Sequence, residues 1–422
     1  MTGTSRHRDL PRGFSDVGPD RMAVQQQLER RWFTQCALSG FQPVQVPPVG
    51  FTDTFVTGHH AAGERIYRFP DRRNRDLALV SDSLPALLRL AGSQTLSAQR
   101  LSYCCPVFRY ERKPRRHFHH LGIMEVAQIP FDPELQSRAI RRQISIIADF
   151  LKPIVNAQFT ITDPGIWYEL TQRFVPAEKV SGYLDRLRRT RPQERGAALR
   201  ADGAPAWIIA TMEALVGDGN LDAINSAPES ITVRIAVDRE LVDLLKHDGI
   251  NASLNLGELH ASEFHDGIAF QVWHGSSLLG DGGSYGRFAS EFLNDHLSSC
   301  AGVVGLEKVA DLAGHHHETI RAADIAILAF PQKQSMKCAD ELTSMLRNHG
   351  IAVWDDLLTM PVRRHLRNIA ALNIPLSLLI GENEVTSEDC RIRDDSGALF
   401  TVPKNDVRNW IAERIERAAQ RM

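Results

Sequence analysis

Two β-type runs joined by a short cationic loop constrain this chain more than any other feature. The first run covers residues 101–110, and alternation along an extended strand puts Arg109 and Glu111 on one face. A basic loop follows at residues 112–116, and the second run begins near Phe118. A guanidinium suits bidentate phosphate contacts, an aromatic ring can stack on a base, and a carboxylate can accept from an exocyclic amine. The pattern predicts a strand–loop–strand that cradles a nucleotide, with a solvated basic surface hairpin as the alternative.

Length and composition are those of an ordinary soluble globular protein. The 422 residues suggest two or three domains, with 43% hydrophobic and 24% charged residues. The 49 basic and 51 acidic residues give a net charge of −2, so bulk attraction to nucleic acid is not indicated, although a local basic face is compatible with it. No apolar run approaches the roughly 20 residues of a membrane span, and the N-terminus lacks the apolar core of a signal peptide. We expect a cytoplasmic protein with no membrane partner.

The cysteines and histidines form no metal-binding pattern. The 6 cysteines are scattered without C-x-x-C spacing, which argues against both a zinc site and a disulfide framework. Cys104 and Cys105 lie in a β-type run and are interpreted as buried packing. The triple histidine at residues 315–317 falls on an expected helix, where consecutive side chains point in different directions. We therefore expect no metal site built from protein side chains alone.

Hydrophobic periodicity divides the larger, N-terminal part of the chain into helices and strands. Helical spacing of apolar residues predicts helices over residues 19–39, 82–92, 135–152 and 309–322. β-type runs at residues 251–258, 267–274 and 300–305 indicate a mixed, mainly antiparallel sheet. An arginine-rich, mostly helical region lies between residues 165 and 250. Its residues 186–195 are interpreted first as a solvated helix face, with a tRNA contact as the alternative.

The tail from about residue 323 has the pattern of a separate α/β unit. Apolar strands are predicted at residues 325–330, 351–354 and 376–381, and they alternate with helices at 339–349 and 363–372. Strands that alternate with helices in this way indicate parallel βαβ units.

Several motifs in chain order resemble the class II aminoacyl-tRNA synthetases, specifically the histidyl branch. The strand–loop–strand resembles motif 2 of that branch, in which Phe-Arg-Tyr-Glu-Arg leads through a loop into Phe-His-Gln. The other matching segments are the Arg-Gly-x-x-Asp-like opening (residues 12–16), motif 1 with its proline (40–47), Gly-Gly-Ser-Tyr (282–285), the motif 3 match Gly-Leu-Glu-Lys (305–308), and two signatures of the branch's anticodon-binding domain (346–350 and 380–384).

This resemblance implies a fold and a domain division. We expect an α+β protein whose core is a class II synthetase-like antiparallel sheet with flanking helices, followed by a C-terminal α/β domain of the anticodon-binding type. The expected domains are residues 1–318, with the helical insertion at about 165–250, and residues 319–422. In the family, motif 1 builds a dimer interface, so a homodimer is expected. The family's cofactors are ATP and Mg2+.

The resemblance also assigns roles in ATP binding. Amino-acid activation adds negative charge at the α-phosphate, so the protein contributes mainly positioned cations. Arg109 matches the family's α-phosphate clamp, Glu111 its contact to the adenine amine and Phe118 its stacking ring. We also assign Arg115 and Arg116, at the end of the loop, to the ATP site.

Two of the family's catalytic cations are altered here. Lys308 replaces the motif 3 arginine, which keeps the charge but loses the planar fork that also stacks on adenine. His260 stands where the histidyl branch has its own arginine, and a neutral imidazole does not reproduce that clamp. We expect activation of histidine at ordinary rates to be impaired.

The residues that would read the amino acid differ from the family's as well. Met124 replaces the glutamate that would pair with an imidazole, so the site lacks that partner. Asp82 is the remaining candidate for the α-amino group. The other candidate amino-acid-binding residues are His120, Phe264, His265 and Tyr285. We interpret the substrate as an amino-acid-like molecule other than histidine.

The acceptor and the activity stay open at this level. The motif 2 loop is about three residues shorter than usual, which weakens the case for tRNA as acceptor and leaves a carrier protein or a small amine as alternatives. Residues 256–267 also resemble the regulatory subunit of ATP phosphoribosyltransferase, which does not aminoacylate and typically lacks the C-terminal domain. The leading hypothesis is an adenylate-forming enzyme with altered specificity, which includes a divergent histidine–tRNA ligase as a minor case. The second is a non-catalytic regulatory subunit with a phosphoribosyltransferase partner, and the last is a structural or RNA-binding role.

Overall fold

The computed structural model describes residues 9–56, 65–93, 98–110, 115–128, 132–217, 224, 227–259, 265–293, 297–313 and 321–420. The chain divides into two compact units, Met1–His315 and His316–Met422. The boundary expected after residue 318 and the triple histidine both fall in a stretch outside the described residues.

A large mixed sheet forms the centre of the N-terminal unit. In the described part of the chain it has eight strands, in the order β1-β5-β6-β11-β10-β9-β7-β8. Their bounds are Gln42–Pro43 (β1), Ala98–Phe108 (β5), His117–Ala127 (β6), Gln158–Thr162 (β7), Ala252–Leu254 (β8), Ala269–His274 (β9), Ser277–Ser284 (β10) and Ser298–Gly305 (β11). The central pairs are antiparallel, whereas β1 and β8 join the sheet by parallel pairing at its two ends. The predicted fold class is confirmed.

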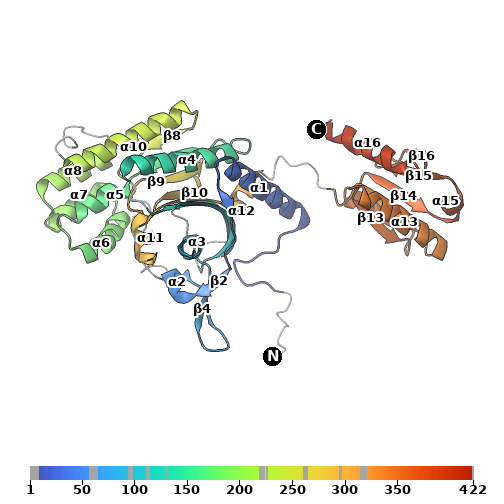
Figure 1. Cartoon of the computed structure of the whole chain (residues 1–422), viewed down its shortest axis with the longest axis horizontal. Helices are drawn as coiled ribbons and strands as arrows, with labels where there is room; N and C mark the ends of the chain where they lie inside the picture. Colours follow the sequence, from blue (N-terminus) through green and yellow to red (C-terminus); the bar gives the residue numbers. More distant parts are fainter. Residues whose placement is uncertain are drawn as a thin grey trace. The chain divides into compact units, whose positions relative to one another are not determined.

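Helices cover both faces of this sheet. Those packed around it are Pro19–Leu38 (α1), Thr52–Val56 (α2), Ser83–Gly92 (α3), Pro133–Leu151 (α4), Gly286–Leu293 (α11) and Leu306–Ala313 (α12). Figure 1 shows α3 inside the curve of the sheet and α4 across its outer face. A small three-stranded sheet lies beside α2, with strands Val49–Phe51 (β2), Arg68–Pro70 (β3) and Asp76–Leu79 (β4).

Local sequence explains why α4 starts and packs as it does. The side chain of Asp132 accepts a hydrogen bond from the backbone N–H of Leu135 at 2.8 Å, which caps the helix. Ile140, Ile144 and Ile147 recur at helical spacing and are fully buried against the sheet. The expected helix at 309–322 differs, because α12 ends at Ala313 and residues 321–324 are not helical.

The arginine-rich region folds as a helical subdomain with its own buried core. Its helices are Pro164–Thr171 (α5), Ala177–Arg189 (α6), Pro192–Ala201 (α7), Ala206–Val216 (α8) and Glu229–His247 (α10). The solvated-face interpretation agrees with Arg186, which is largely exposed and pairs with Asp202. It is wrong for Arg195, which is only 4% exposed. Arg195 donates to the carbonyls of Leu187 (2.9 Å) and Gly257 (2.6 Å), so this guanidinium links two segments of the unit.

The C-terminal unit contains a five-stranded sheet in the described residues, in the order β13-β12-β14-β15-β16. Its elements are Ile325–Ala329 (β12), Lys333–Asn348 (α13), Val353–Leu357 (β13), Val362–Ala371 (α14), Leu376–Ile380 (β14), Glu382–Thr386 (α15), Asp389–Asp394 (β15), Leu399–Pro403 (β16) and Val407–Gln420 (α16). The three predicted strands are parallel, as expected. The antiparallel hairpin β15–β16 and helix α16 complete the unit and were not predicted. In the described part of the chain, no helix has the length and apolarity to cross a membrane.

Candidate functional site

Arg109 and Phe118 of motif 2 come together on one side of the large sheet. Arg109 directly follows β5, and its backbone N–H donates to the carbonyl of Arg116 at 2.9 Å, which closes the hairpin. The Cζ atom of Arg109 lies 5.6 Å from the ring centroid of Phe118 on β6. A guanidinium at this distance interacts favourably with an aromatic ring. The expected clamp and the expected stacking ring therefore face the same space.

Arg109 is fixed by two acceptors from the start of α3. Its Nε donates to the carbonyl of Ser81 at 2.8 Å, and its Nη2 lies 3.1 Å from Oδ2 of Asp82. The other oxygen of Asp82 accepts from the backbone N–H of Leu84 and caps α3. The side chains of Arg109 and Asp82 are 29% and 41% exposed. The two residues expected to bind oppositely charged parts of the substrates are thus paired with each other in the protein.

The two loop arginines have protein partners of their own. Arg115 forms an ion pair with Asp311 of α12 at 2.8 Å. Arg116 lies over the ring of Tyr110 at 4.3 Å, and its backbone N–H donates to the carbonyl of Gly13 at 2.9 Å. Gly13 has φ +88°, and a Cβ there would come within 2.6 Å of the Arg116 side chain, so this close approach requires glycine. The Arg-Gly opening of the chain therefore rests directly on the motif 2 loop.

Motif 3 is tied to motif 2 through a carboxylate that sequence reasoning did not single out. Glu307 accepts from the backbone N–H of His119 and contacts its Nδ1, both at 2.8 Å. Burial of Glu307 would raise its pKa, but the hydrogen bonds from His119 outweigh this and lower the pKa below its ordinary value. Lys308, the next residue, is exposed, and its Nζ donates to the carbonyl of Leu278 at 2.5 Å. In the sequence, the histidines of motif 2 could have pointed to this contact, because a histidine can pair with a carboxylate.

His120 is a buried, neutral histidine on the same sheet face. Burial, and then the nearby positive charge of Arg109, lower its pKa to about 4. It is 9% exposed, and its Nδ1 has no hydrogen-bond partner in the described part of the chain. The imidazole is therefore uncharged at pH 7 and retains hydrogen-bonding capacity for another group.

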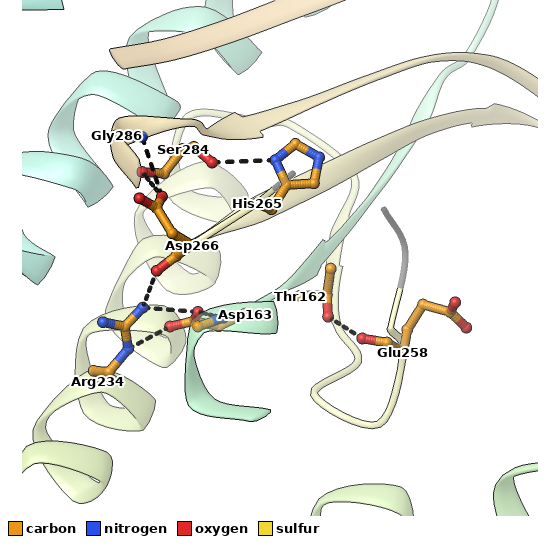
Figure 2. Close-up of polar contacts among 9 residues, drawn as sticks. Thr162, Asp163, Arg234, Glu258, His265, Asp266, Ser284 and Gly286 are labelled. Carbon is orange, nitrogen blue, oxygen red and sulfur yellow. Dashed lines mark hydrogen bonds and ion pairs between the residues drawn. The ribbon is translucent and has the colours of Figure 1, made fainter. Parts of the chain in front are cut away.

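Three of the candidate amino-acid-binding residues, Met124, His265 and Tyr285, lie in or against one buried core. Met124 is fully buried in the core between the sheet and α3, and Tyr285 packs against this core. The ring of His265 lies 4.5 Å from that of Tyr285, and its Nδ1 lies 3.3 Å from the carbonyl oxygen of Ser284 (Figure 2). The structure thus brings Met124, His265 and Tyr285 together. Glu111, His260 and Phe264 lie outside the described residues, so their roles stay predictions.

Two further residues on this face were missed by sequence reasoning. The ring of Tyr103 lies directly over Gly122, where a Cβ would be only 2.2 Å from the tyrosine Cζ. Asp281 faces the same side, because it pairs with Val303 in the row that includes Gly122 and Tyr103. Its negative charge acts on Tyr103 and raises the pKa of that phenol, after the larger effect of burial. Only the strand register reveals that these residues share a face.

The helical subdomain contacts the segment that follows His265 (Figure 2). Arg234 on α10 binds both carboxylate oxygens of Asp163, at 2.9 and 3.0 Å, and its Nη2 lies 3.4 Å from the carbonyl oxygen of Asp266. The carboxylate of Asp266 accepts from Ser284 Oγ at 2.7 Å and from the backbone N–H of Gly286 at 3.3 Å. The turn that follows His265 is therefore fixed from two sides.

Comparison with known proteins bears directly on this arrangement. The family model described as Histidyl-tRNA synthetase matches residues 13–309, which is more than half of the chain. The chain belongs to the histidyl-tRNA synthetase family. A second model, described as Anticodon binding domain, matches residues 324–414. The resemblance inferred from the motifs is thereby confirmed.

Relatives of two kinds are similar to this family member. The histidine–tRNA ligase of Archaeoglobus fulgidus is 24% identical over 402 residues, which cover 92% of this chain and 95% of that protein. The ATP phosphoribosyltransferase regulatory subunit of Moorella thermoacetica is 36% identical over 121 residues, or 27% of this chain and 31% of that protein.

Solved structures of both descriptions share the fold. The histidyl-tRNA synthetase of Nostoc sp. PCC 7120 has a TM-score of 0.74 and 15% identity, and the match covers 96% of this chain and 99% of that one. A structure from Bacillus halodurans described as an ATP phosphoribosyltransferase regulatory subunit/histidyl-tRNA synthetase has a TM-score of 0.71 and 16% identity, covering 86% and 97%. At these identities the likeness establishes the fold alone.

Proposed function

We propose that this protein binds ATP on the concave sheet face and activates the carboxylate of an amino acid other than histidine. The observation that carries the proposal is the placement of the Arg109 guanidinium beside the Phe118 ring, on a half-open face. A fixed cation next to a stacking surface suits a nucleotide phosphate attached to a purine. Family membership supports the same chemistry.

The chain's own residues would act mainly by positioning. The substrate carboxylate attacks the α-phosphorus of ATP, an O–P bond forms, and the bond to the leaving pyrophosphate breaks. Arg109 would move from Asp82 to the α-phosphate and stabilise the charge that develops there. Asp82, released from this pair, would accept from the substrate ammonium. The Nδ1 of the neutral His120, which has no hydrogen-bond partner among the described residues, can accept a hydrogen bond from the same ammonium group.

Magnesium accompanies ATP in this family, and the described residues suit a metal held chiefly by phosphate oxygens. No group of three or more metal-binding side chains exists among the described residues. Mg2+ in such sites commonly takes only one or two protein carboxylates. Asp281, in the strand row that includes Gly122 and Tyr103, is a carboxylate on this face that would contact the metal. Bound magnesium would supply charge neutralisation of the phosphates.

A substrate other than histidine is supported by the chemistry of the residues that replace the family's readers. Met124 offers no charge or hydrogen bond to an imidazole, and it is fully buried. A site that leaves the polar atoms of a buried ligand unpaired discriminates strongly against that ligand. The acceptor of the activated group would be a tRNA, a carrier protein or a small amine. The C-terminal unit of the anticodon-binding type favours tRNA among these.

We also propose that the protein is a cytoplasmic homodimer. The motif 1 strand β1 lies at the edge of the sheet, where a cavity of about 760 Å³ is lined by Gly40, Gln42, Arg100, Arg142 and Glu125 among others. Glu125 is buried there, and its Oε1 has no partner in the described part of the chain. A second copy would cover this cavity. Light scattering that returned the mass of a single 47.2 kDa chain, or fractionation with membranes, would contradict this part of the proposal.

A regulatory subunit is the second candidate function. It is supported by the 36% identity to the Moorella regulatory subunit over 121 residues, which cover 27% of this chain and 31% of that protein. The replacement of motif 3 arginine by Lys308 is consistent with reduced catalysis. In that case the partner would be a phosphoribosyltransferase.

ATP–pyrophosphate exchange over a panel of amino acids, together with calorimetry for ATP, tests the proposal. We expect ATP binding and exchange with at least one amino acid that is not histidine. Arg109→Ala should weaken ATP binding by tenfold or more. Arg141→Ala is the matched control, because Arg141 pairs with Asp248 away from this face and its loss should leave ATP binding unchanged.

The other outcomes separate the alternatives. Exchange with histidine alone would identify a divergent histidine–tRNA ligase. ATP binding without exchange, together with co-purification of a phosphoribosyltransferase, would support the regulatory function. Absence of ATP and AMP binding would overturn both nucleotide-dependent readings, and RNA binding that weakens as salt rises would then point to the RNA-binding role.

A further inference from the structure

Three rows of paired residues cross the central strands and form the floor of the candidate site. Residues paired across antiparallel strands point to the same face of a sheet, so each row can be read from the register. In order of decreasing distance along β5 from Arg109, the rows are Leu101–Met124–Ala301–Gly283, Tyr103–Gly122–Val303–Asp281 and Cys105–His120–Gly305. The candidate amino-acid-binding residues Met124 and His265 lie at the first row, so the side chain of an amino acid bound beside Arg109 would extend toward it.

Side chains of the protein itself fill the far rows. The ring of Tyr103 covers Gly122, and its atoms lie 2.2–2.5 Å from the place of a Cβ there. The ring of His265 covers Gly283 in the same way, at 2.5–2.7 Å. Tyr103, Met124 and His265 are 1%, 0% and 1% exposed. The space above these rows is therefore occupied by packed side chains.

Neighbouring elements hold these rings in place. The hydroxyl of Tyr103 lies 3.3 Å from Ser83 Oγ at the start of α3. Met124 belongs to one buried core with Leu84 and Leu87 of α3. Cores of this kind are packed like crystals, so extra atoms enter only if backbone or side chains shift.

The near end of the site is different, because it reaches solvent. The side chains of Arg109 and Asp82 are 29% and 41% exposed, and Lys308 is exposed. His120, in the third row, is 9% exposed and marks the limit of the open part. A nucleotide and the carboxyl and amino groups of an amino acid have access here, whereas a long side chain does not.

We propose, on the basis of the function proposed above, that the activated amino acid carries a minimal side chain, as in glycine or alanine. The carboxylate of Asp82, at the exposed start of α3, provides negative charge for its ammonium group. Tyr103, Met124 and His265 then set specificity by occupying the space that a larger side chain would need.

Calorimetry on the full-length protein with stable adenylate analogues tests this directly. The probes are AMP and the glycyl, alanyl, leucyl and histidyl sulfamoyl-adenosines. We expect the glycyl and alanyl probes to bind at least tenfold more tightly than AMP, and the leucyl and histidyl probes to bind no more tightly than AMP. These probes need no turnover, so they measure the size of the site even if the chemical step is slow.

A variant pair tests the role of the floor. Met124→Ala should improve binding of the leucyl probe by at least tenfold. The control is Ile123→Ala, which removes a side chain that is equally buried but faces the opposite side of the same strand. It should leave the relative affinities for the probes unchanged.

Each remaining result has a definite meaning. A histidyl or leucyl probe that bound as tightly as the alanyl probe would overturn the proposed substrate class, and so would glycyl and alanyl probes no better than AMP. No gain for the leucyl probe in a folded Met124→Ala protein would overturn the role of Met124. Loss of AMP and ATP binding altogether would instead overturn the proposed function on which this inference rests. The wild-type panel decides the substrate class if the variant does not fold.

Discussion

His120 links the electrostatics of the site to the stability of the protein. Its pKa is about 4 in the folded chain, because it is buried and lies near Arg109, whereas the ordinary value is 6.5. Below pH 6.5 the unfolded chain therefore binds a proton that the folded chain refuses until about pH 4. By linkage, stability falls as the pH drops through this window. A shift of this size corresponds to about 3 kcal/mol.

We expect His120→Gln to remove that part of the pH dependence. Urea unfolding at pH 7 and pH 4.5 should show a smaller loss of free energy of unfolding on acidification in the variant than in the wild type. His247→Gln is the control, since that side chain is 87% exposed and its replacement should leave the pH dependence as it is. Equal losses in His120→Gln and wild type would contradict the buried, neutral state of His120.

At the scale of elements, the pair Arg234–Asp163 connects helix α10 to the turn beneath the amino-acid group. Asp163 is 1% exposed and Arg234 15% exposed, so removal of one partner leaves a buried charge without compensation. We expect Arg234→Met to lower the free energy of unfolding by about 3–5 kcal/mol. Urea unfolding at pH 7 measures this change.

A double variant provides the control for this prediction. In Asp163→Asn/Arg234→Met the carboxylate of Asp163 is replaced by an uncharged amide, so the loss should be clearly smaller than in the single variant. A double variant as unstable as Arg234→Met would mean that the packing of the arginine, and not the charge it neutralises, stabilises this junction.

How much the sequence predicts also differs from element to element. Alternation and apolar runs were enough for the β5–β6 hairpin and for the parallel strands β12 and β14, because these segments are largely buried and locally regular. Strand β13 was found because buried Ile351 and Val353 alternate with exposed residues. The hairpin β15–β16 was missed, because charged residues alternate with the buried residues of β15 and only one residue of the short strand β16 is buried. Helix α13 begins at Lys333, whereas the sequence predicted a start at residue 339. The prediction missed the first turn of the helix because that turn is polar.

The site was predictable in its residue types and less so in its pairings. Arg109 and Phe118 lie in one motif, so their shared face followed from alternation along the strands. The ion pair of Arg109 with Asp82 joins residues 27 positions apart and depends on where α3 starts. Asp281 reaches the same face only through pairing with strands much earlier in the chain. Such contacts depend on the register of the sheet, which a single sequence does not specify.

At the scale of the whole molecule, each of the two units has a hydrophobic core of its own. The C-terminal unit buries residues from every strand of its sheet and from α13 and α16, including Ile327, Leu346, Leu378, Ile392 and Ile411. About 100 residues around one core is a common size for an independently folding domain. The nucleotide-binding residues proposed above all belong to the N-terminal unit.

We therefore expect the two units to be separable. Residues 316–422 expressed alone should show one cooperative thermal transition by circular dichroism, and residues 1–315 should bind AMP within about threefold of the full-length affinity. A chain cut after Gly350 is the control: it separates β12 from β13, two strands paired along their whole length, so neither piece should contain a complete C-terminal sheet. Residues 316–422 that unfolded without a transition would contradict independent folding of the C-terminal unit. A requirement for these residues in AMP binding would contradict the assignment of the nucleotide site to the N-terminal unit alone.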